Sequence, residues 1–424
     1  MSDILVFNNK FRPLRPKSSI DWIALCVLIF SFGGLISFYI PNNGIQNFAG
    51  LLFLLVLVFS KKMMPFNGLA GLIYFLLICY TLYNTYITFS EHYHYVMHVT
   101  NKSLTNIFRS ILFVPNFLPF ILLCIKKENP NIRYILSFAS LLLCCYIYYY
   151  PFAFINMVTF KFNFNAAGEW GESGTYGDFI SNSTLGISSI AVPVFVVYLK
   201  KYLNVKQWKW YLLAYLGGWI LSIYMARRGA VVIQLLYLVS CWLVYMLYDN
   251  NTSRIKVVFV TIAYLAIFYM LFLGGGDTLF ANLLSRGSED TRSGVELNFW
   301  LDMDEHSIMF GRGWFGEYYE HFAADNRPWI ETGYLSLILR GGVIYLILYV
   351  SLLLLSAIKG IFFSKNIMLK SMGTIILISL IELYPYGWPE FNINYLIIWL
   401  GVYMCNQKEY RNLSDLEVYN LYFK

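Results

Sequence analysis

The chain consists mainly of long apolar runs separated by short polar connections. Most runs reach the roughly 20 residues that an α-helix needs to cross a bilayer. The runs are continuous and do not alternate with polar residues, so the pattern predicts helices and not barrel strands. We expect about twelve transmembrane helices, near residues 20–40, 46–60, 67–90, 107–125, 134–152, 183–200, 210–226, 230–249, 256–273, 333–358, 370–386 and 391–405.

Composition excludes a soluble globular protein. Of the 424 residues, 58% are hydrophobic and only 13% are charged, whereas about a quarter of the residues in a soluble domain are charged. The predicted fold class is therefore an all-α polytopic integral membrane protein, with residues 1–424 forming a single membrane domain. The seven cysteines lie in or beside apolar runs and indicate no disulfide framework.

The distribution of Lys and Arg predicts the orientation. With a cytoplasmic N-terminus, 21 of the 31 basic residues fall on the inner side, whereas 17 of the 24 acidic residues fall on the outer side. This positive-inside bias explains the net charge of +7 without a nucleic-acid partner. We expect cytoplasmic tails at 1–19 and 406–424, an external loop at 153–182, and a large external (periplasmic) loop at 274–332, between the ninth and tenth helices.

Arginine is concentrated on the predicted outer side. Eight of the ten basic residues there are Arg, compared with five of the 21 inside. A guanidinium group binds phosphate or carboxylate with two parallel hydrogen bonds and tolerates partial desolvation. The bias favours a site for an anionic, phosphorylated ligand, and pairing with outer acids is an equal alternative for each Arg in the large loop. The candidates are Arg227, Arg228, Arg286, Arg292, Arg312 and Arg340.

Two polar residues flank or enter the span near 333–358. Glu331 precedes Thr332, which is a suitable N-cap for a helix that starts at the next residue. Arg340 would then lie about seven residues inside a straight helix, roughly 10 Å below its outer end. An Arg at that depth should face protein, a polar cavity or an acid, and Glu382 in a neighbouring span is the candidate partner.

The large loop also combines aromatic and acidic residues. Trp314 follows Gly311-Arg-Gly313, and Asp302-Met-Asp304 lies upstream. Aromatic faces stack on sugars and carboxylates accept hydrogen bonds from hydroxyls, so this composition fits carbohydrate binding as well as an interfacial aromatic belt. The D-x-D spacing is also used to hold a cation, but three residues in an acidic loop are weak evidence, and we expect no metal.

Several short motifs occur in an order that resembles the O-antigen ligase/polymerase superfamily, and more closely its O-antigen polymerases. The resemblance covers residues 215–360 in detail. It implies a metal-independent glycosyltransferase, without a cofactor, in the bacterial inner (cytoplasmic) membrane. The motifs are Met225-Ala-Arg-Arg-Gly-Ala230, Arg292, Trp300, Gly311-Arg-Gly313 and Glu331-Thr-Gly-Tyr-Leu-Ser-Leu-Ile-Leu-Arg-Gly-Gly342.

The resemblance implies roles for individual residues. Arg228 and Arg292 would hold the pyrophosphate of an undecaprenyl-pyrophosphate-linked oligosaccharide, assisted by Arg227 and Arg286. We hypothesise that Glu331 is the general base that takes the proton of the acceptor hydroxyl. The remaining substrate-binding candidates are Arg312, Trp314 and Arg340.

The expected activity is polymerisation of lipid-linked repeat units into surface polysaccharide at the outer face of the membrane. The implied partners are the lipid-linked oligosaccharide, the bilayer, a chain-length regulator and a flippase. One alternative is an O-antigen ligase that transfers glycan to lipid A-core, although ligases usually carry a histidine where this chain has Glu331. The other is a lipid-linked oligosaccharide flippase or transporter.

Overall fold

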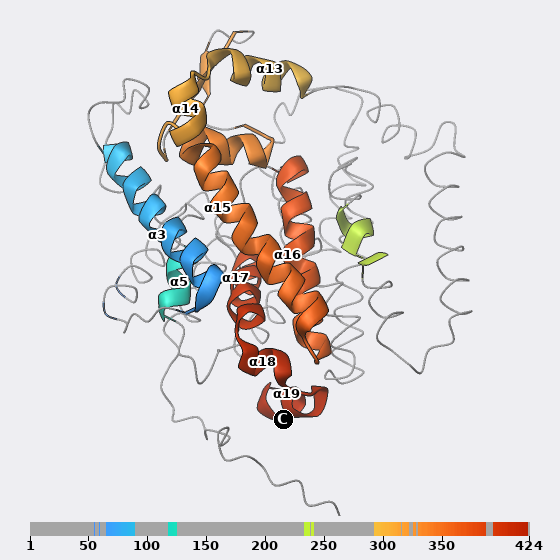
Figure 1. The fold of residues 1–424 in the computed structure, drawn as a ribbon. Helices are drawn as coiled ribbons and strands as arrows, with labels where there is room; N and C mark the ends of the chain where they lie inside the picture. The colour runs from blue at the N-terminus through green and yellow to red at the C-terminus, as the bar shows by residue number, and fades with distance from the viewer. Residues whose placement is uncertain are drawn as a thin grey trace, which may run out of the picture.

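The described residues form a helical bundle with one short hairpin (Figure 1). Three helices are long and apolar enough to cross a membrane, namely α3 (Gly68–Phe89), α15 (Gly333–Phe363) and α16 (Ile367–Tyr386). The mainly helical fold is thus confirmed for the described residues, with three helices that could span a membrane. The computed structural model describes residues 55, 59, 65–89, 118–124, 233–237, 239–240, 292–314, 316–321, 325–327, 330–386 and 393–422.

Four predicted spans have clear counterparts. Helices α3, α15 and α16 match the runs near 67–90, 333–358 and 370–386. The shorter α17 (Ile393–Asn406) matches 391–405, and α5 (Leu118–Cys124) lies within 107–125. The total of twelve spans, the N-terminal tail and the loop at 153–182 fall outside the described residues and stay predictions.

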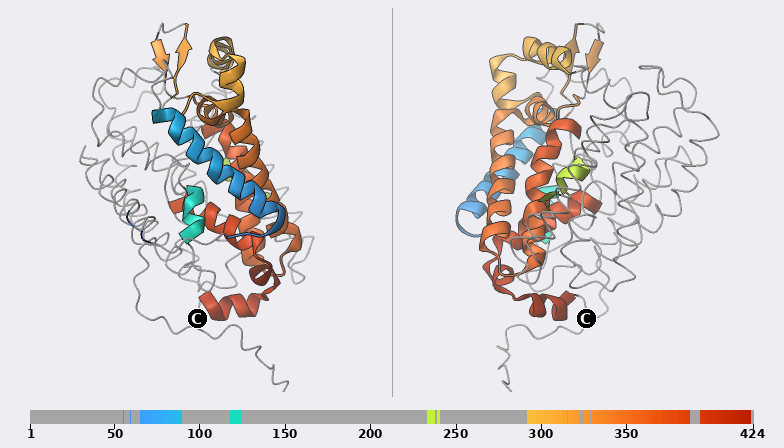
Figure 2. Two further views of the ribbon diagram at one scale, coloured as in Figure 1. Left: turned by 60° about the vertical axis from the view of Figure 1, so that its left-hand side comes forward. Right: turned by 90° about the vertical axis from the view of Figure 1, so that its right-hand side faces the viewer.

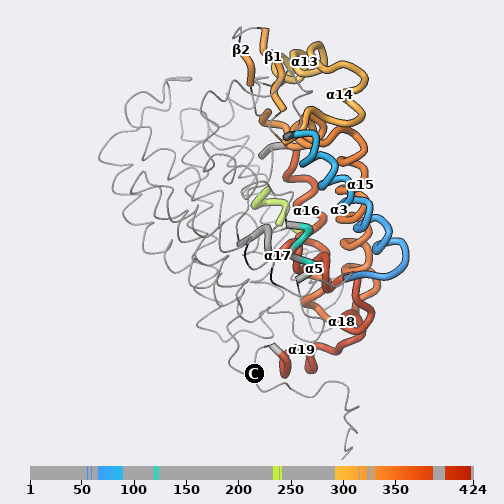
Figure 3. Tube along the Cα trace, turned by 90° about the vertical axis from the view of Figure 1, so that its left-hand side faces the viewer, coloured from blue at the N-terminus to red at the C-terminus, as the bar shows by residue number. Residues whose placement is uncertain are grey.

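Helix α3 has a polar stripe, formed by Thr81, Asn84, Thr85 and Thr88. The spacing i, i+3, i+4 and i+7 places these side chains on one face of a helix. The stripe is covered by protein, whereas α3 exposes apolar side chains elsewhere, as expected where a helix meets lipid. Figure 3 shows α3 in blue alongside α15. The exposed side chains are Leu69, Leu72, Phe75, Leu76, Leu82, Tyr83 and Tyr86.

Helix α15 is bent at Gly342, where the backbone is not helical (φ 70°, ψ 178°). The bend separates residues 333–341 from the long apolar segment that follows. Glycine adopts a positive φ at little steric cost. A Cβ at this position would also overlap the backbone carbonyl of Met309 in α14 (Glu305–Phe310). Gly342 therefore permits both the bend and the close approach of α14.

Small residues bring α15, α16 and α17 together farther along the bundle. A Cβ on Gly360 of α15 would lie 2.9 Å from the Cα of Gly373 in α16 and 2.6 Å from the sulfur of Cys405 in α17. Helices in a membrane associate largely through such close packing. The turn after α15 then holds the C-terminal helices α18 (Lys408–Asn412) and α19 (Asp415–Tyr422), because Asn366 donates to the Tyr410 carbonyl at 2.9 Å.

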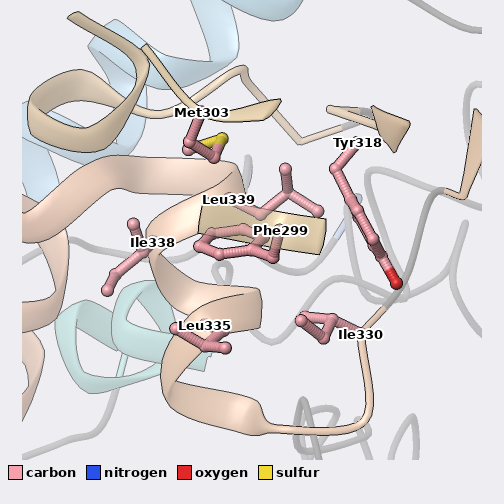
Figure 4. Close-up of a cluster of buried hydrophobic side chains, with 7 residues drawn as sticks. All are labelled: Phe299, Met303, Tyr318, Ile330, Leu335, Ile338 and Leu339. Carbon is pink, nitrogen blue, oxygen red and sulfur yellow. The ribbon is translucent and has the colours of Figure 1, made fainter. Parts of the chain in front are cut away.

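The connecting segment, defined here as residues 292–332, is a small folded unit at one end of the bundle. It contains α13 (Ser293–Asp302), α14, and a hairpin of β1 (Tyr318–Glu320) and β2 (Asp325–Arg327). Apolar side chains pack it against the start of α15 (Figure 4). This core consists of Phe299, Met303, Tyr318, Ile330, Leu335, Ile338 and Leu339.

The connecting segment and the C-terminal helices lie at opposite ends of the bundle (Figure 2). That the loop at 274–332 and the tail at 406–424 lie on opposite sides of a membrane stays a prediction. Which of the two sides is cytoplasmic stays a prediction.

Candidate functional site

The structure brings Arg292 and Glu331 together where α13 and α15 begin. Arg292 is the N-cap residue of α13, and Glu331 lies two residues before α15. The Arg292 Nε is 3.9 Å from a Glu331 carboxylate oxygen, and the two side chains are 28% and 59% exposed. A solvent-exposed ion pair of this kind contributes at most about 1 kcal/mol to stability. Both side chains are therefore partly accessible to a ligand, and their mutual ion pair is weak.

The end of α16 supports the Arg292 side chain. Its Nη1 donates to the carbonyl oxygen of Tyr384 at 3.2 Å, and its guanidinium carbon lies 5.4 Å from the centre of the Tyr384 ring. This is a cation–π distance. Tyr384 is itself half-exposed. Arg292 is thus oriented by α16 at the end of the bundle that carries the connecting segment.

The predicted start of α15 is confirmed. Thr332 is the N-cap residue and Gly333 the first residue of the helix. The Thr332 hydroxyl donates to the Glu296 carboxylate at 2.7 Å and makes no capping hydrogen bond. Because Glu296 belongs to α13, this bond ties α13 to the start of α15. It therefore helps to fix the position of Arg292 relative to Glu331.

Arg312 lies in the interior of the connecting segment and is 2% exposed. Its Nη1 donates to Asp302 Oδ2 at 2.5 Å and to the Glu317 carbonyl at 2.8 Å. Its Nη2 donates to the Asp302 carbonyl at 2.5 Å, and its Nε donates to the Ser307 hydroxyl at 3.3 Å. The guanidinium group therefore joins the end of α13 to α14 and to the residue before β1.

The two acids of the D-x-D motif serve different local structures. Asp302 binds Arg312 and also accepts a hydrogen bond from the Tyr319 amide at 3.1 Å. Asp304 is the N-cap of α14 and accepts from the Ser307 amide at 2.6 Å. Hydrogen bonding with Ser307 holds the pKa of the Asp304 carboxyl below its usual value. Within the described ranges, no group of three or more His, Cys, Asp or Glu could hold a metal ion.

Trp314 is buried between α3 and α15, with 3% of its surface exposed. Its backbone amide donates to the Thr88 hydroxyl at 2.8 Å, and its indole Nε1 donates to the Thr85 hydroxyl at 2.9 Å. Its ring meets the ring of Tyr345 edge-on, with 5.7 Å between centroids. These contacts anchor the connecting segment on the polar stripe of α3, and the ring is covered by protein.

The predicted pairing of Arg340 with Glu382 is wrong. Arg340 lies in the short part of α15 before the bend at Gly342, so it does not lie on the long straight span that the prediction assumed. Its carbonyl accepts a hydrogen bond from the Asn84 side-chain amide at 2.7 Å. The Glu382 carboxylate accepts instead from the Tyr237 hydroxyl at 3.5 Å. In the part of the chain that the structure describes, no ion pair joins Glu382 to Arg340.

Three candidates, Arg227, Arg228 and Arg286, lie outside the described residues, so their relation to Arg292 stays a prediction.

The role of Tyr384 had no signal in the sequence, because a carbonyl and one aromatic ring within an apolar run look like ordinary lipid-facing structure. The stripe on α3 did have a signal, namely its helical spacing of polar residues within a span.

No family model matches the chain, and no curated protein is similar enough to it to count as a match.

Proposed function

We propose that the protein is a polysaccharide polymerase of the bacterial inner membrane, with both termini in the cytoplasm. It would join undecaprenyl-pyrophosphate-linked oligosaccharide repeat units at the outer face, as a metal-independent glycosyltransferase. The order of motifs that resembles O-antigen polymerases supports the proposal. The observation that carries it is Arg292 beside Glu331, both partly exposed, at the end of a helix long enough to span a membrane.

The donor in this reaction carries its own activation. Cleavage of the bond between the anomeric carbon and the diphosphate oxygen leaves additional negative charge on the departing diphosphate. A guanidinium group in a partly dry site stabilises that charge. Arg292 is suited to this role because Tyr384 orients its side chain and because the positive end of α15 begins close by. Arg228, with Arg227 and Arg286, would complete the diphosphate site.

Glu331 would act on the acceptor. As the acceptor hydroxyl oxygen attacks the anomeric carbon, its proton passes to the Glu331 carboxylate while the bond to the diphosphate breaks. Attack from the face opposite the leaving diphosphate predicts inversion of configuration at that carbon. A glutamate fits this role because the proposed site faces water, into which the proton can afterwards be released.

The ion pair between Arg292 and Glu331 would link donor binding to base availability. At 3.9 Å the contact is long and exposed to solvent, so it is weak. A diphosphate carries more charge than a carboxylate and offers two oxygens to the planar guanidinium fork. Donor binding would therefore displace Glu331 from Arg292 and free the carboxylate to meet the acceptor hydroxyl.

The test is to express variants in cells that lack the chromosomal copy and to measure the length distribution of the surface polysaccharide. Glu331→Gln removes the proton acceptor while keeping the shape, and should reduce polymer formation by roughly 10²–10⁴-fold. Arg292→Lys keeps the charge but loses the planar fork, and should also shorten the polymer. Normal polymer from Glu331→Gln at normal protein level would show that Glu331 is not the base.

Two matched controls come from the same connecting segment. Glu305→Gln changes an exposed carboxylate in α14, and Arg327→Lys changes an arginine paired with Glu320 in the hairpin. Neither residue contacts Arg292 or Glu331 in the structure. Both controls should leave polymer length unchanged, which separates loss of the site from a general effect of altered charge.

A further inference from the structure

Glu382 is a carboxylate buried inside the bundle, four residues before α16 ends. Its exposure is 8%. Its Oε2 accepts a long hydrogen bond of 3.5 Å from the Tyr237 hydroxyl, and its Oε1 has no hydrogen-bond partner among the described residues. Burying a carboxylate oxygen without a partner is costly, and ionisable side chains within membrane spans usually mark functional sites. The unpaired oxygen therefore indicates a group that a ligand can satisfy.

This carboxylate lies on the same helix as a residue that contacts the proposed site. Tyr384, which orients Arg292, follows Glu382 by two residues on the same helix. Tyr237 belongs to the segment that follows Arg227 and Arg228 in the sequence. The described part of that segment, lime green in Figure 2, lies beside α16. Glu382 is thus bound by Tyr237 and lies on the helix whose Tyr384 contacts Arg292.

We infer that Glu382 is a carbohydrate-binding residue, whose Oε1 accepts a hydrogen bond from a hydroxyl of the lipid-linked sugar. The Tyr237 hydroxyl, bound to Oε2, positions the carboxylate. This inference rests on the proposed function and names the part of the substrate that this carboxylate recognises.

The chemistry of the substrate selects the sugar. A carboxyl oxygen that carries no proton only accepts hydrogen bonds, in the neutral group as in the ionised one. The diphosphate also only accepts, and a polyprenyl chain has no donor. Sugar hydroxyls donate and can therefore pair with this oxygen. Of the three parts of the substrate, the sugar alone is complementary to Glu382.

The experiment measures binding of two lipids to the full-length protein in nanodiscs. One is undecaprenyl pyrophosphate carrying the repeat unit, extracted from cells that lack the protein, and the other is undecaprenyl pyrophosphate without sugar. Glu382→Leu should weaken binding of the sugar-bearing lipid about tenfold to a hundredfold and leave the bare lipid unchanged. Tyr237→Phe should give a smaller loss with the same selectivity, whereas Arg292→Lys should weaken both lipids.

Equal losses for both lipids, or no loss for either, would overturn the inference, as would wild-type protein that does not prefer the sugar-bearing lipid. If Glu382→Leu is not recovered folded, Tyr237→Phe decides by the same selectivity. A protein that shows this selectivity but forms no polymer would refute the polymerase proposal and leave the sugar-binding role of Glu382 intact.

Discussion

Replacing Arg312 with alanine tests whether this arginine is part of the fold or part of a ligand site. The Arg312 side chain is 1% exposed and lies 2.5 Å from the Asp302 carboxylate, which is 19% exposed. Removing one member of a buried ion pair costs about 3–5 kcal/mol, because the other charge stays buried without a partner. We therefore expect Arg312→Ala to destabilise the connecting segment by about this amount.

Two further variants refine the magnitude. Arg312→Lys keeps the charge but cannot reach Asp302, Ser307 and the Glu317 carbonyl together, so it should lose about 1.5–3 kcal/mol. The double variant Asp302→Ala/Arg312→Ala should be less destabilised than the sum of the single variants, because neither charge is then left unpaired. Arg292→Ala is the comparison variant and should change stability much less than Arg312→Ala, because its contacts with Glu331 and Tyr384 are partly exposed to solvent.

The assay is pulse proteolysis in urea on protein purified in detergent. Peptide mapping monitors the cleavage within residues 292–332. The expected result is a much lower urea midpoint for Arg312→Ala and a midpoint close to that of wild type for Arg292→Ala. If the two variants have the same midpoint, the interior position of Arg312 does not stabilise this segment and the reasoning is refuted.

Three other predictions concern the fold around the site. Gly342→Ala should lower the midpoint of thermal unfolding far more than Gly68→Ala. Both glycines have a positive φ, but of the two only Gly342 has backbone within reach of a new Cβ. Equal shifts would mean that the close contact of Gly342 with α14 does not determine the loss of stability. Asp304→Ala should cost about 1 kcal/mol at neutral pH. Because the pKa of the folded Asp304 carboxyl is lowered, its stabilisation is present above the usual value and is lost as the pH falls through the lowered value. The urea midpoints of wild type and variant should therefore converge in acid, and a constant gap would contradict this assignment. Trp314→Phe should cost about 1 kcal/mol by losing the indole hydrogen bond to Thr85, while surface polysaccharide remains unchanged. Shortened polymer from stable Trp314→Phe would instead favour a role in sugar binding.

The helices could be predicted because a bilayer imposes a simple rule on the sequence. A spanning helix must be continuously apolar over roughly 20 residues, and α3, α15 and α16 follow this rule to within a few residues. The start of α15 could also be predicted, because a threonine before an apolar run is a favourable N-cap. The bend at Gly342 could not be placed, because its cause is the contact with α14.

Partners within the connecting segment were harder to predict. An arginine or tryptophan in an external loop has the same appearance in the sequence whether it binds a ligand or its own chain. Arg312 is satisfied by Asp302, ten residues away, whereas Trp314 is anchored on Thr88, which is 226 residues away. The second contact depends on the packing of α3 against α15, which apolar periodicity alone does not specify.

Proximity of Arg292 and Glu331 was expected from the proposed chemistry, and the structure shows the reason for it. The Thr332–Glu296 hydrogen bond and the Arg292–Tyr384 contacts hold the starts of α13 and α15 at the end of α16. Each of these contacts joins residues from different helices. Their pairing depends on tertiary structure, so no local pattern in the sequence reveals it.

The most direct test of the central claim uses purified protein in liposomes with undecaprenyl-pyrophosphate-linked repeat units as the sole substrate. The account predicts a ladder of products that differ by one repeat unit, formed in the presence of chelator and abolished in Arg292→Ala protein of normal stability. Wild-type protein that binds the lipid but forms no ladder, or Arg292→Ala protein that forms the same ladder as wild type, would contradict it.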